Sequence, residues 1–285
     1  MSEPPLTSPR SAALQRLGVV GWPVAHSLSP LIQNAALRDA GLGESWRYQL
    51  LPVPPVLLSQ TLPALGRTGF RGVNVTIPHK PAALALADSA SASAAGSGAA
   101  NALLFAPDGS LHAENTDAPA LIAALEARVE LRGASVVVLG AGGTARTAVW
   151  ALTQAGAAEV SVWNRTRSRT SELARTFGAS VLETVPSGGE ILINCTAAGL
   201  DGGDQLAALG LNAAAVADWE VVVDYVYRPG GTPLASAAAA ASRRCVDGLE
   251  LLIRQGALSF ELFTGADAGR ALAAMRAALA ISSAA

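Results

Sequence analysis

The stretch VVVLGAGGTAR, residues 136–146, predicts a buried strand that runs into a glycine turn and then a helix. Three valines and a leucine are apolar on both faces, as a strand inside a parallel sheet requires. Gly140 and Gly142 let the backbone turn tightly beside a pyrophosphate, and the first N–H groups of the helix point at that anion. The pattern is typical of dinucleotide-binding proteins, although ordinary glycine-rich βα turns share it.

The residues after this helix indicate which dinucleotide is bound. A second strand is expected at Glu159 to Trp163, which completes a β-α-β unit, and the segment NRTRSR follows at residues 164–169. An NAD site carries an acidic residue there for the ribose 2′-hydroxyl, whereas this segment carries three arginines. Guanidinium groups bind phosphate in a bidentate fork, so Arg165 and Arg169 favour NADP. A solvated basic start of a helix is the alternative.

Length and composition limit the class of protein. With 285 residues, 51% of them hydrophobic, the chain is long enough for two domains with cores of their own. A net charge of −2 without a basic stripe argues against a nucleic-acid partner, and we expect no membrane span. Cys195 and Cys245 indicate neither a disulfide framework nor a metal site and fit a reducing cytoplasm. Residues 1–15, rich in proline, predict a flexible tail rather than a signal peptide.

The N-terminal half alternates expected strands and helices. Strands are expected at Leu17 to Gly21, Trp46 to Leu51 and Phe70 to Ile77, with helical segments between them. The loop after the first strand carries Ser27 and Ser29 just before a helix. Helix capping explains one serine, but two exceed what a single cap needs, so the loop is a candidate binding loop.

Polar side chains gather where the third of these strands ends. Asn74 and Thr76 belong to the strand, and Lys80 precedes Pro81 at the expected start of a helix. Open α/β sheets bind ligands at the carboxyl edge of their strands, which makes these groups candidates for a site. A lysine is ordinarily solvated and without a function, and here only its neighbours favour one.

A carboxylate follows a predicted hairpin. The turn signal Pro107-Asp108-Gly109 joins two short strands at residues 101–105 and 110–113. Asp117 comes next and has two interpretations, as the N-cap of a helix over residues 118–128 or as a carboxylate of a site. Both hold if the cap faces a cleft.

The C-terminal half continues the alternation. Buried strands are expected from Glu190 and from Val221, and a short one at residues 244–246 completes the sheet of the β-α-β unit. Two helices, at about residues 249–263 and 269–279, end the chain.

Together these motifs resemble the shikimate dehydrogenase family, whose members reduce 3-dehydroshikimate with NADPH in aromatic amino-acid (chorismate) biosynthesis. The resemblance covers nearly the whole chain. It rests on residues 21–30 (GWPVAHSLSP), 74–80 (NVTIPHK), Asn101, 115–117 (NTD), 140–145, 164–169, 194–196 (NCT) and 247–255.

The resemblance implies an α/β fold of two domains with a cleft between them. The N-terminal α/β domain, residues 16–116, would bind the substrate and would be completed by C-terminal helices over residues 248–285. A Rossmann-type NADP-binding domain would span residues 117–247. We expect a cytoplasmic monomer or homodimer whose partner is a small molecule, shikimate or 3-dehydroshikimate, and no metal.

The resemblance also implies roles for single residues. Lys80 and Asp117 would form the catalytic pair. The substrate would contact Ser27, Ser29, Asn74, Thr76, Asn101, Asp117, Tyr227 and Gln255. The cofactor would contact Gly140, Ala141, Gly142, Gly143, Thr144, Asn164, Arg165, Thr166, Arg169, Thr196, Tyr225 and Gly248. Two places depart from the family pattern. Ala102 stands after Asn101 where the family usually carries threonine, which removes a hydroxyl near the site, and Ala113 and Ala118 stand beside the NTD segment where the family often carries glycine, which makes that turn stiffer.

The chemistry of a ketone reduction agrees with this assignment. Hydride addition leaves negative charge on the oxygen, so a cationic proton donor must stand within hydrogen-bond reach, and Lys80 fits that need. Asp117 would orient the ammonium. Two alternatives remain, a quinate/shikimate dehydrogenase of broader specificity and a noncatalytic nucleotide-sensing module. The second needs no proton donor, so the presence of both Lys80 and Asp117 argues against it.

Overall fold

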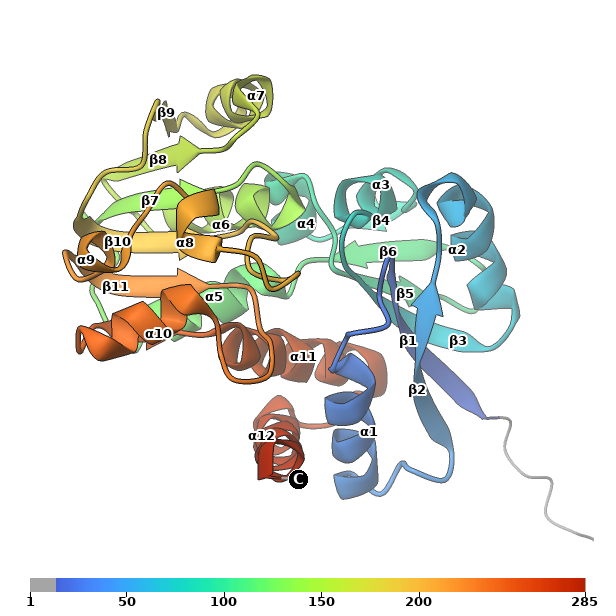
Figure 1. The fold of residues 1–285 in the computed structure, drawn as a ribbon. Helices are drawn as coiled ribbons and strands as arrows, with labels where there is room; N and C mark the ends of the chain where they lie inside the picture. Colours follow the sequence, from blue (N-terminus) through green and yellow to red (C-terminus); the bar gives the residue numbers. More distant parts are fainter. Residues whose placement is uncertain (1–13, 285) are drawn as a thin grey trace, which may run out of the picture.

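The computed structural model describes residues 14–284, and it divides their strands between two sheets (Figure 1). Residues 1–13 and 285 lie outside the described part, so almost all of the predicted tail is untested. Strand β1 (Gln15–Gly21) already begins at the last residue assigned to that tail. The α/β class and the two-sheet organisation expected from the sequence are confirmed.

The first sheet is mixed. Its strand order is β2-β1-β3-β5-β6-β4, in which β1 pairs in parallel with β2 and β3, while β3 and β5 are antiparallel. The hairpin predicted around Pro107 to Gly109 is confirmed, because β5 and β6 pair antiparallel and Gly109 adopts a positive φ of 90°. The bounds are β2 (Trp46–Pro52), β3 (Phe70–Val75), β4 (Ser89–Ala90), β5 (Ala102–Phe105) and β6 (Leu111–Glu114).

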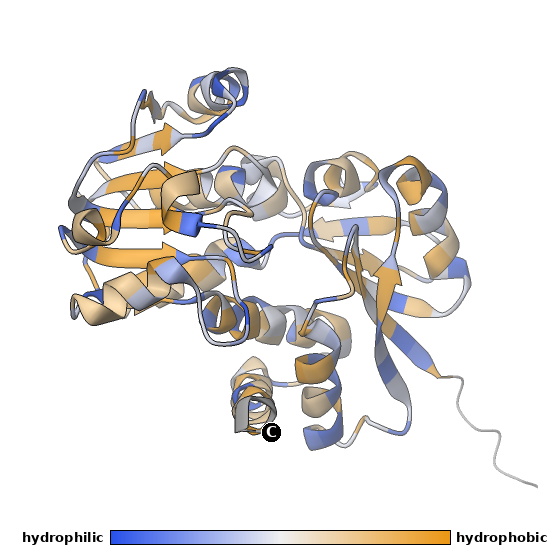
Figure 2. Ribbon diagram, viewed as in Figure 1, coloured by the Kyte–Doolittle hydropathy of each residue, from blue (hydrophilic) through white to orange (hydrophobic). Residues whose placement is uncertain are grey.

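The second sheet is entirely parallel and has the order β12-β11-β10-β7-β8-β9. Its central strands are apolar on both faces, as Figure 2 shows, because helices cover both sides. The predicted β-α-β unit is confirmed as β7, α6 and β8. The bounds are β7 (Ser135–Leu139), β8 (Glu159–Trp163), β9 (Ser180–Val181), β10 (Gly189–Asn194), β11 (Trp219–Asp224) and β12 (Arg244–Val246).

Helices connect and cover these strands. The helical segment expected between β2 and β3 consists of a 3-10 turn, η1 (Pro55–Leu57), followed by the ten-residue helix α2 (Leu58–Arg67). The other helices are α1 (Ser29–Asp39), α3 (Lys80–Ala85), α4 (Ala92–Ser97), α5 (Asp117–Glu126), α6 (Gly143–Gln154), α7 (Arg167–Phe177), α8 (Gln205–Ala208), α9 (Ala213–Val216), α10 (Pro233–Ala240), α11 (Gly248–Thr264) and α12 (Ala268–Ala284). Within residues 14–284, none of them combines the length and the apolar character needed to cross a membrane.

The two C-terminal helices return to the first sheet. Phe260 of α11 and Met275 of α12 lie in one buried cluster with Val19 of β1 and Ile32 of α1. The approach is close enough that a Cβ on Gly72 would lie 2.3 Å from the Phe263 ring, so β3 needs glycine there. This packing supports the proposal that residues 248–285 complete the N-terminal domain.

Candidate active site

A cavity and an adjoining groove lie between the two halves of the molecule. The cavity, of about 170 Å³, is bordered by the carboxyl end of β3, by the loop before α1 and by α11. The groove, of about 810 Å³, follows the carboxyl edge of the second sheet. Lys80, Thr144 and Thr196 border both spaces, so the two meet at these side chains.

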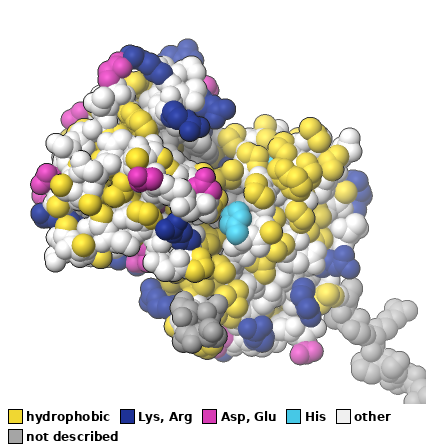
Figure 3. Space-filling view, in the orientation of Figure 1, with side chains coloured by type: hydrophobic (Ala, Val, Ile, Leu, Met, Phe, Trp, Pro, Cys, Tyr) yellow, Lys and Arg dark blue, Asp and Glu magenta, His cyan; other side chains and the backbone are white. Residues whose placement is uncertain are grey.

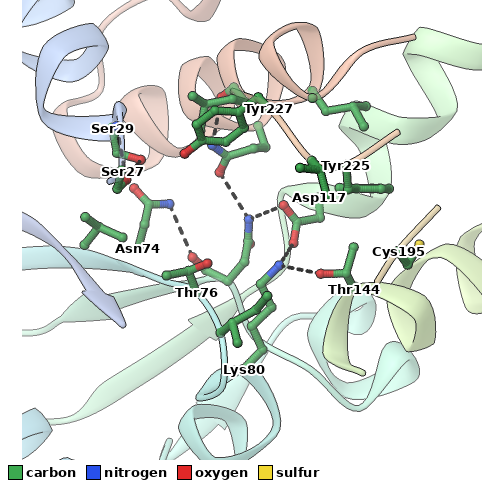
Figure 4. A pocket seen from close by; sticks show the side chains of 18 of the residues that line it. Ser27, Ser29, Asn74, Thr76, Lys80, Asp117, Thr144, Cys195, Tyr225 and Tyr227 are labelled. Carbon is green, nitrogen blue, oxygen red and sulfur yellow. Dashed lines mark hydrogen bonds and ion pairs between the residues drawn. The ribbon is translucent and has the colours of Figure 1, made fainter. Parts of the chain in front are cut away.

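Lys80 and Asp117 form a buried ion pair at this meeting point (Figure 4). The distance from Lys80 Nζ to Asp117 Oδ2 is 2.7 Å, and the side chains are only 11% and 8% exposed. Lys80 Nζ also donates to Thr144 Oγ1 at 3.2 Å, a group that belongs to the second half of the molecule. A buried ammonium needs such partners, because isolated charges are very costly to remove from water.

The local chain explains why Lys80 points inward. Lys80 is the first residue of α3, and Pro81 is tolerated in the first helical turn because its missing N–H would have no partner there. His79 is buried beside it, with Nε2 2.7 Å from the carbonyl oxygen of Val53. The turn is therefore anchored to the segment that directly follows β2. Lys80 is also the only lysine in the chain, so the sequence itself singles this residue out.

The prediction that Asp117 caps α5 is wrong. Thr116 is the N-cap without a side-chain capping bond, and it is Asn115 Oδ1 that accepts from the backbone here, from Ala118 N at 3.1 Å. The Asp117 carboxylate is therefore left for Lys80 and for Asn101, whose Nδ2 donates to Asp117 Oδ1 at 2.9 Å.

Asn101 joins three segments of the chain at the cavity wall. Its Nδ2 atom donates to Asp117 Oδ1, to Thr116 Oγ1 at 2.9 Å and, more weakly, to Gln255 Oε1 at 3.3 Å. Its Oδ1 atom accepts from Thr116 N at 2.7 Å. Gln255 comes from α11, so the C-terminal helix contributes to the wall as the resemblance implies.

Hydroxyl groups gather at another part of the cavity wall. Ser27 Oγ lies 3.1 Å from Ser29 Oγ and accepts from Ser29 N at 3.2 Å, whereas the N-cap of α1 is Leu28 and no side chain caps it. Burial raises the pKa of Tyr227, although hydrogen bonds with the Leu28 backbone and the Ser27 side chain act against burial. The Tyr227 phenol is therefore protonated at neutral pH and lies beside the serines.

The amide of Asn74 lines the cavity but is fully hydrogen-bonded within the protein. Its Oδ1 atom accepts from Tyr48 Oη at 2.8 Å. Its Nδ2 atom donates to Ser259 Oγ at 2.8 Å and to Asn101 O at 3.3 Å. Thr76, the other predicted contact from this strand, also lines the cavity. The sequence motifs gave no sign of Tyr48 or Ser259, because each lies far along the chain from Asn74.

The groove has the features of an anion site at the start of a helix. Gly140 has a φ of 120°, and a Cβ there would lie 3.2 Å from the Cys195 backbone, so glycine is required. Gly142 is the N-cap of the twelve-residue helix α6, and no side chain caps that end. The first N–H groups of α6 thus remain for a ligand. The predicted cofactor residues that line this groove are Gly140, Ala141, Gly142, Gly143, Thr144, Asn164, Arg165, Thr166, Arg169 and Thr196.

Basic side chains gather around the place of α7 in the molecule (Figure 3, dark blue). The three arginines after β8 have different surroundings there. Arg165 and Arg169 line the groove. Arg167 instead pairs with Glu183 on the exposed surface. The groove thus presents two guanidinium groups where a ribose phosphate is expected, and the residues present fit an NADP-type cofactor.

Two predicted cofactor residues lie elsewhere. Tyr225 and Gly248 line the cavity that contains Lys80, and neither borders the groove with Gly140. A Cβ on Gly248 would lie 2.7 Å from the Val226 carbonyl, so glycine permits α11 to start against that loop. Burial raises the pKa of Tyr225 well above its ordinary value, and its hydroxyl has no hydrogen-bond partner among the described residues. Their cofactor roles stay predictions.

The fold and the site define a two-domain oxidoreductase of the Rossmann type, with a dinucleotide groove and a lysine–carboxylate pair where it meets the cavity. Family models match three parts of the chain: the shikimate dehydrogenase substrate binding domain at residues 19–103, shikimate / quinate 5-dehydrogenase at 122–198, and the shikimate 5'-dehydrogenase C-terminal domain at 248–280. The chain belongs to the shikimate dehydrogenase family.

Individual relatives agree with the family models. Shikimate dehydrogenase (NADP(+)) of Anaeromyxobacter dehalogenans is 43% identical over 275 residues, which cover 90% of this chain and 95% of that protein. The enzyme of the same name from Caulobacter vibrioides is 42% identical and covers 87% and 89%. Among solved structures, shikimate 5-dehydrogenase of Thermus thermophilus in complex with NADP(H) and shikimate has a TM-score of 0.79 at 39% identity, covering 93% of this chain and 100% of that chain.

Proposed function

We propose that this protein catalyses the reversible NADPH-linked reduction of 3-dehydroshikimate to shikimate in aromatic amino-acid biosynthesis. The observation that carries the proposal is the buried pair of Lys80 and Asp117, 2.7 Å apart where the cavity meets the groove. The names of the relatives, and the NADP(H) and shikimate named with the Thermus thermophilus structure, support it.

The groove residues would hold the cofactor. The backbone from Gly140 to Thr144 and the uncapped first turn of α6 suit the pyrophosphate, and Arg165 and Arg169 suit the 2′-phosphate. Bound NADPH would supply a hydride to the carbonyl carbon. Thr144 lies in the first turn of α6, which lines the groove, and its Oγ1 atom accepts a hydrogen bond from Lys80 Nζ. The segment that would hold the cofactor therefore also contacts the proton donor.

Lys80 would move the proton. Reduction places negative charge on the former carbonyl oxygen, and an ammonium within hydrogen-bond reach stabilises that charge and donates a proton to it. In the reverse direction the neutral amine accepts the hydroxyl proton. Asp117 fixes the direction of Lys80 Nζ, and Asn101 in turn fixes the carboxylate through Oδ1.

Hydrogen bonds would orient the substrate. The hydroxyls of Ser27, Ser29 and Tyr227 would provide donors for a carboxylate, while Asn101 and Gln255, which also line the cavity, would contact the ring hydroxyls. Within the described residues, the cavity lining includes no arginine. Orientation by several neutral donors therefore has to replace a strong ion pair.

The direct test is turnover by the purified protein with shikimate and with quinate, each with NADP and with NAD. We expect oxidation of shikimate with NADP. Comparable turnover of quinate would establish the broader dehydrogenase, and NADP binding without turnover of either acid would establish a nucleotide-sensing module. A cytoplasmic location and a monomeric or homodimeric state are further parts of the proposal, and size measurement in solution tests the second.

A further inference from the structure

Ser259 is a buried side chain that no motif indicated, and it connects three segments of the site. It lies on α11, one helical turn after Gln255, and is 0% exposed. Its Oγ atom accepts from Asn74 Nδ2 at 2.8 Å, donates to Gln255 O at 2.9 Å and lies 3.0 Å from Thr116 Oγ1. One hydroxyl therefore holds α11 against strand β3 and against the turn that precedes α5.

A continuous series of hydrogen bonds leads from Ser259 to the catalytic pair. Thr116 Oγ1 accepts from Asn101 Nδ2 at 2.9 Å, and the same amide donates to Asp117 Oδ1 at 2.9 Å. Asp117 Oδ2 then binds Lys80 Nζ at 2.7 Å. A change at Ser259 thus reaches the carboxylate that directs the ammonium, although Ser259 touches neither group.

We propose that Ser259 is a positioning residue of the dehydrogenase, which fixes Gln255 and Asp117 relative to each other. This inference rests on the proposed function and adds a residue that lies behind the cavity wall. Its action runs through Asn74 and Thr116, whose side chains both bond to its hydroxyl.

The network cannot easily rearrange around a missing hydroxyl. Asn74 Nδ2 would keep only its longer bond to Asn101 O, at 3.3 Å. Rotating the amide would not help, because Oδ1 is held by Tyr48 Oη at 2.8 Å. A buried donor without a good partner is costly, so the strand or the helix shifts to find one. Either shift moves the side chains of the cavity wall.

Strand β5, which pairs with β3, carries no hydroxyl at the residue opposite Asn74. Ala102 of β5 is the antiparallel partner of Asn74, and paired residues point to the same face with Cβ atoms about 4.5–5.5 Å apart. Ala102 is fully buried in the cluster that contains Ile253 and Phe260 of α11. A threonine hydroxyl at residue 102 would therefore face Asn74 and α11. Ser259 supplies from the helix the hydroxyl that the strand lacks.

The experiment compares Ser259→Ala, Ala102→Thr, the double variant and the control Thr264→Ala, which removes a hydroxyl from the same helix that bonds only within the helix end. We expect Ser259→Ala to lower kcat/KM for shikimate about tenfold, since small misplacements of positioning groups have effects of this size or larger. The KM for NADP should stay unchanged. Ala102→Thr should restore most of the loss in the double variant and bring no gain alone, because the space is already filled.

Three results would overturn the inference. These are wild-type kinetics in Ser259→Ala, a fall in Tm without a change in kcat or in the KM for shikimate, and a double variant no better than Ser259→Ala. If Ser259→Ala does not fold, Thr116→Val removes the facing hydroxyl instead and should reproduce the selective loss with shikimate. Failure of the proposed function is distinguishable, because then the wild-type protein itself does not oxidise shikimate.

Discussion

Lys80 Nζ and Asp117 Oδ2 lie 2.7 Å apart although each residue begins a helix of its own, α3 and α5. Helix α3 follows the carboxyl end of β3, and α5 begins where the chain leaves the first sheet for the second. The same ammonium donates to Thr144 on α6. The proton donor is thus held by both halves of the molecule, so their relative position determines where its proton points.

Replacing the ammonium tests the role of Lys80 directly. Lys80→Ala should lower kcat by roughly 10²- to 10⁴-fold, the usual effect of losing a general acid or base, while NADP binding stays nearly intact. Steady-state kinetics and a cofactor titration measure the two quantities. Arg71→Ala, an exposed cation on the preceding strand, is the matched control and should behave as wild type. Turnover near the wild-type value in Lys80→Ala would remove the assignment.

The single lysine allows its ammonium to be observed alone. In protein labelled with ¹³C at the lysine ε-carbon, NMR should show one side-chain signal. We expect that signal to move when NADP and shikimate are added together, because the ligands replace water around the amine. A signal insensitive to both ligands would place Lys80 outside the site.

Substitution of the serine pair Ser27 and Ser29 tests whether these residues bind the substrate or cap helix α1. Ser27→Ala with Ser29→Ala should raise the KM for shikimate and leave the KM for NADP unchanged, because neither serine caps α1. Ser91, which does cap α4 by accepting from Ala94 N, is the control. Ser91→Ala should lower stability by about 0.5–2 kcal/mol without a change in KM. An unchanged KM for shikimate in the double variant would contradict the binding role.

The sequence predicted those parts of the fold that depend on local pattern. The valines before Gly140 are apolar on both faces, and a strand of this kind is stable only inside a covered sheet, so β7 and the turn into α6 followed from neighbouring residues alone. The site motifs at Lys80 and Asp117 were found for the same reason. Each stands within a few residues of a strand end or a helix start.

The missed features depend on contacts between distant segments. Ser259 meets Asn74 across 185 residues, and nothing beside either residue indicates the pairing. Helix α4 likewise packs so closely on α6 that a Cβ on Gly96 would lie 2.5 Å from Trp150 Nε1. Composition cannot show which glycine is required by such an approach.

The carboxylate of Glu250, in the first turn of α11, allows a prediction of how the stability of the protein depends on pH. Burial acts to raise the pKa of Glu250, but hydrogen bonds from Arg254 and Arg128 outweigh it and leave the pKa below its ordinary value. A lowered pKa in the folded state stabilises the protein above the unfolded pKa of about 4.3, and this contribution is lost as the pH falls through the folded value.

Thermal unfolding as a function of pH tests this sign. The Tm difference between wild type and Glu250→Gln should be full above about pH 5 and should shrink as the pH falls below about 4. Glu220→Gln, which breaks the exposed pair with Arg244, should change Tm little at any pH. A difference that grows toward acid pH would show that Glu250 is not stabilised in its charged form.

Cofactor choice follows from the arginines at the groove. A hydrogen bond to a charged group contributes about 1.5–3 kcal/mol, so Arg165→Ala or Arg169→Ala should weaken NADP about ten- to a hundredfold at low salt. Added salt should reduce the loss of NADP affinity, because both side chains are exposed and salt screens their charges. NAD lacks the 2′-phosphate, so its weak use should hardly change. The measurement is kcat/KM for both cofactors at two salt concentrations.

Arg167→Ala provides the control within the same six residues. Arg167 carries the same charge but is paired with Glu183 away from the groove, so its removal should leave NADP affinity within about twofold of wild type. Equal losses in all three variants would mean that net charge alone attracts the cofactor. A variant that loses NADP and NAD equally would mean that the arginines support the fold of this segment. Selective loss in Arg165→Ala and Arg169→Ala alone assigns the 2′-phosphate to those two guanidinium groups.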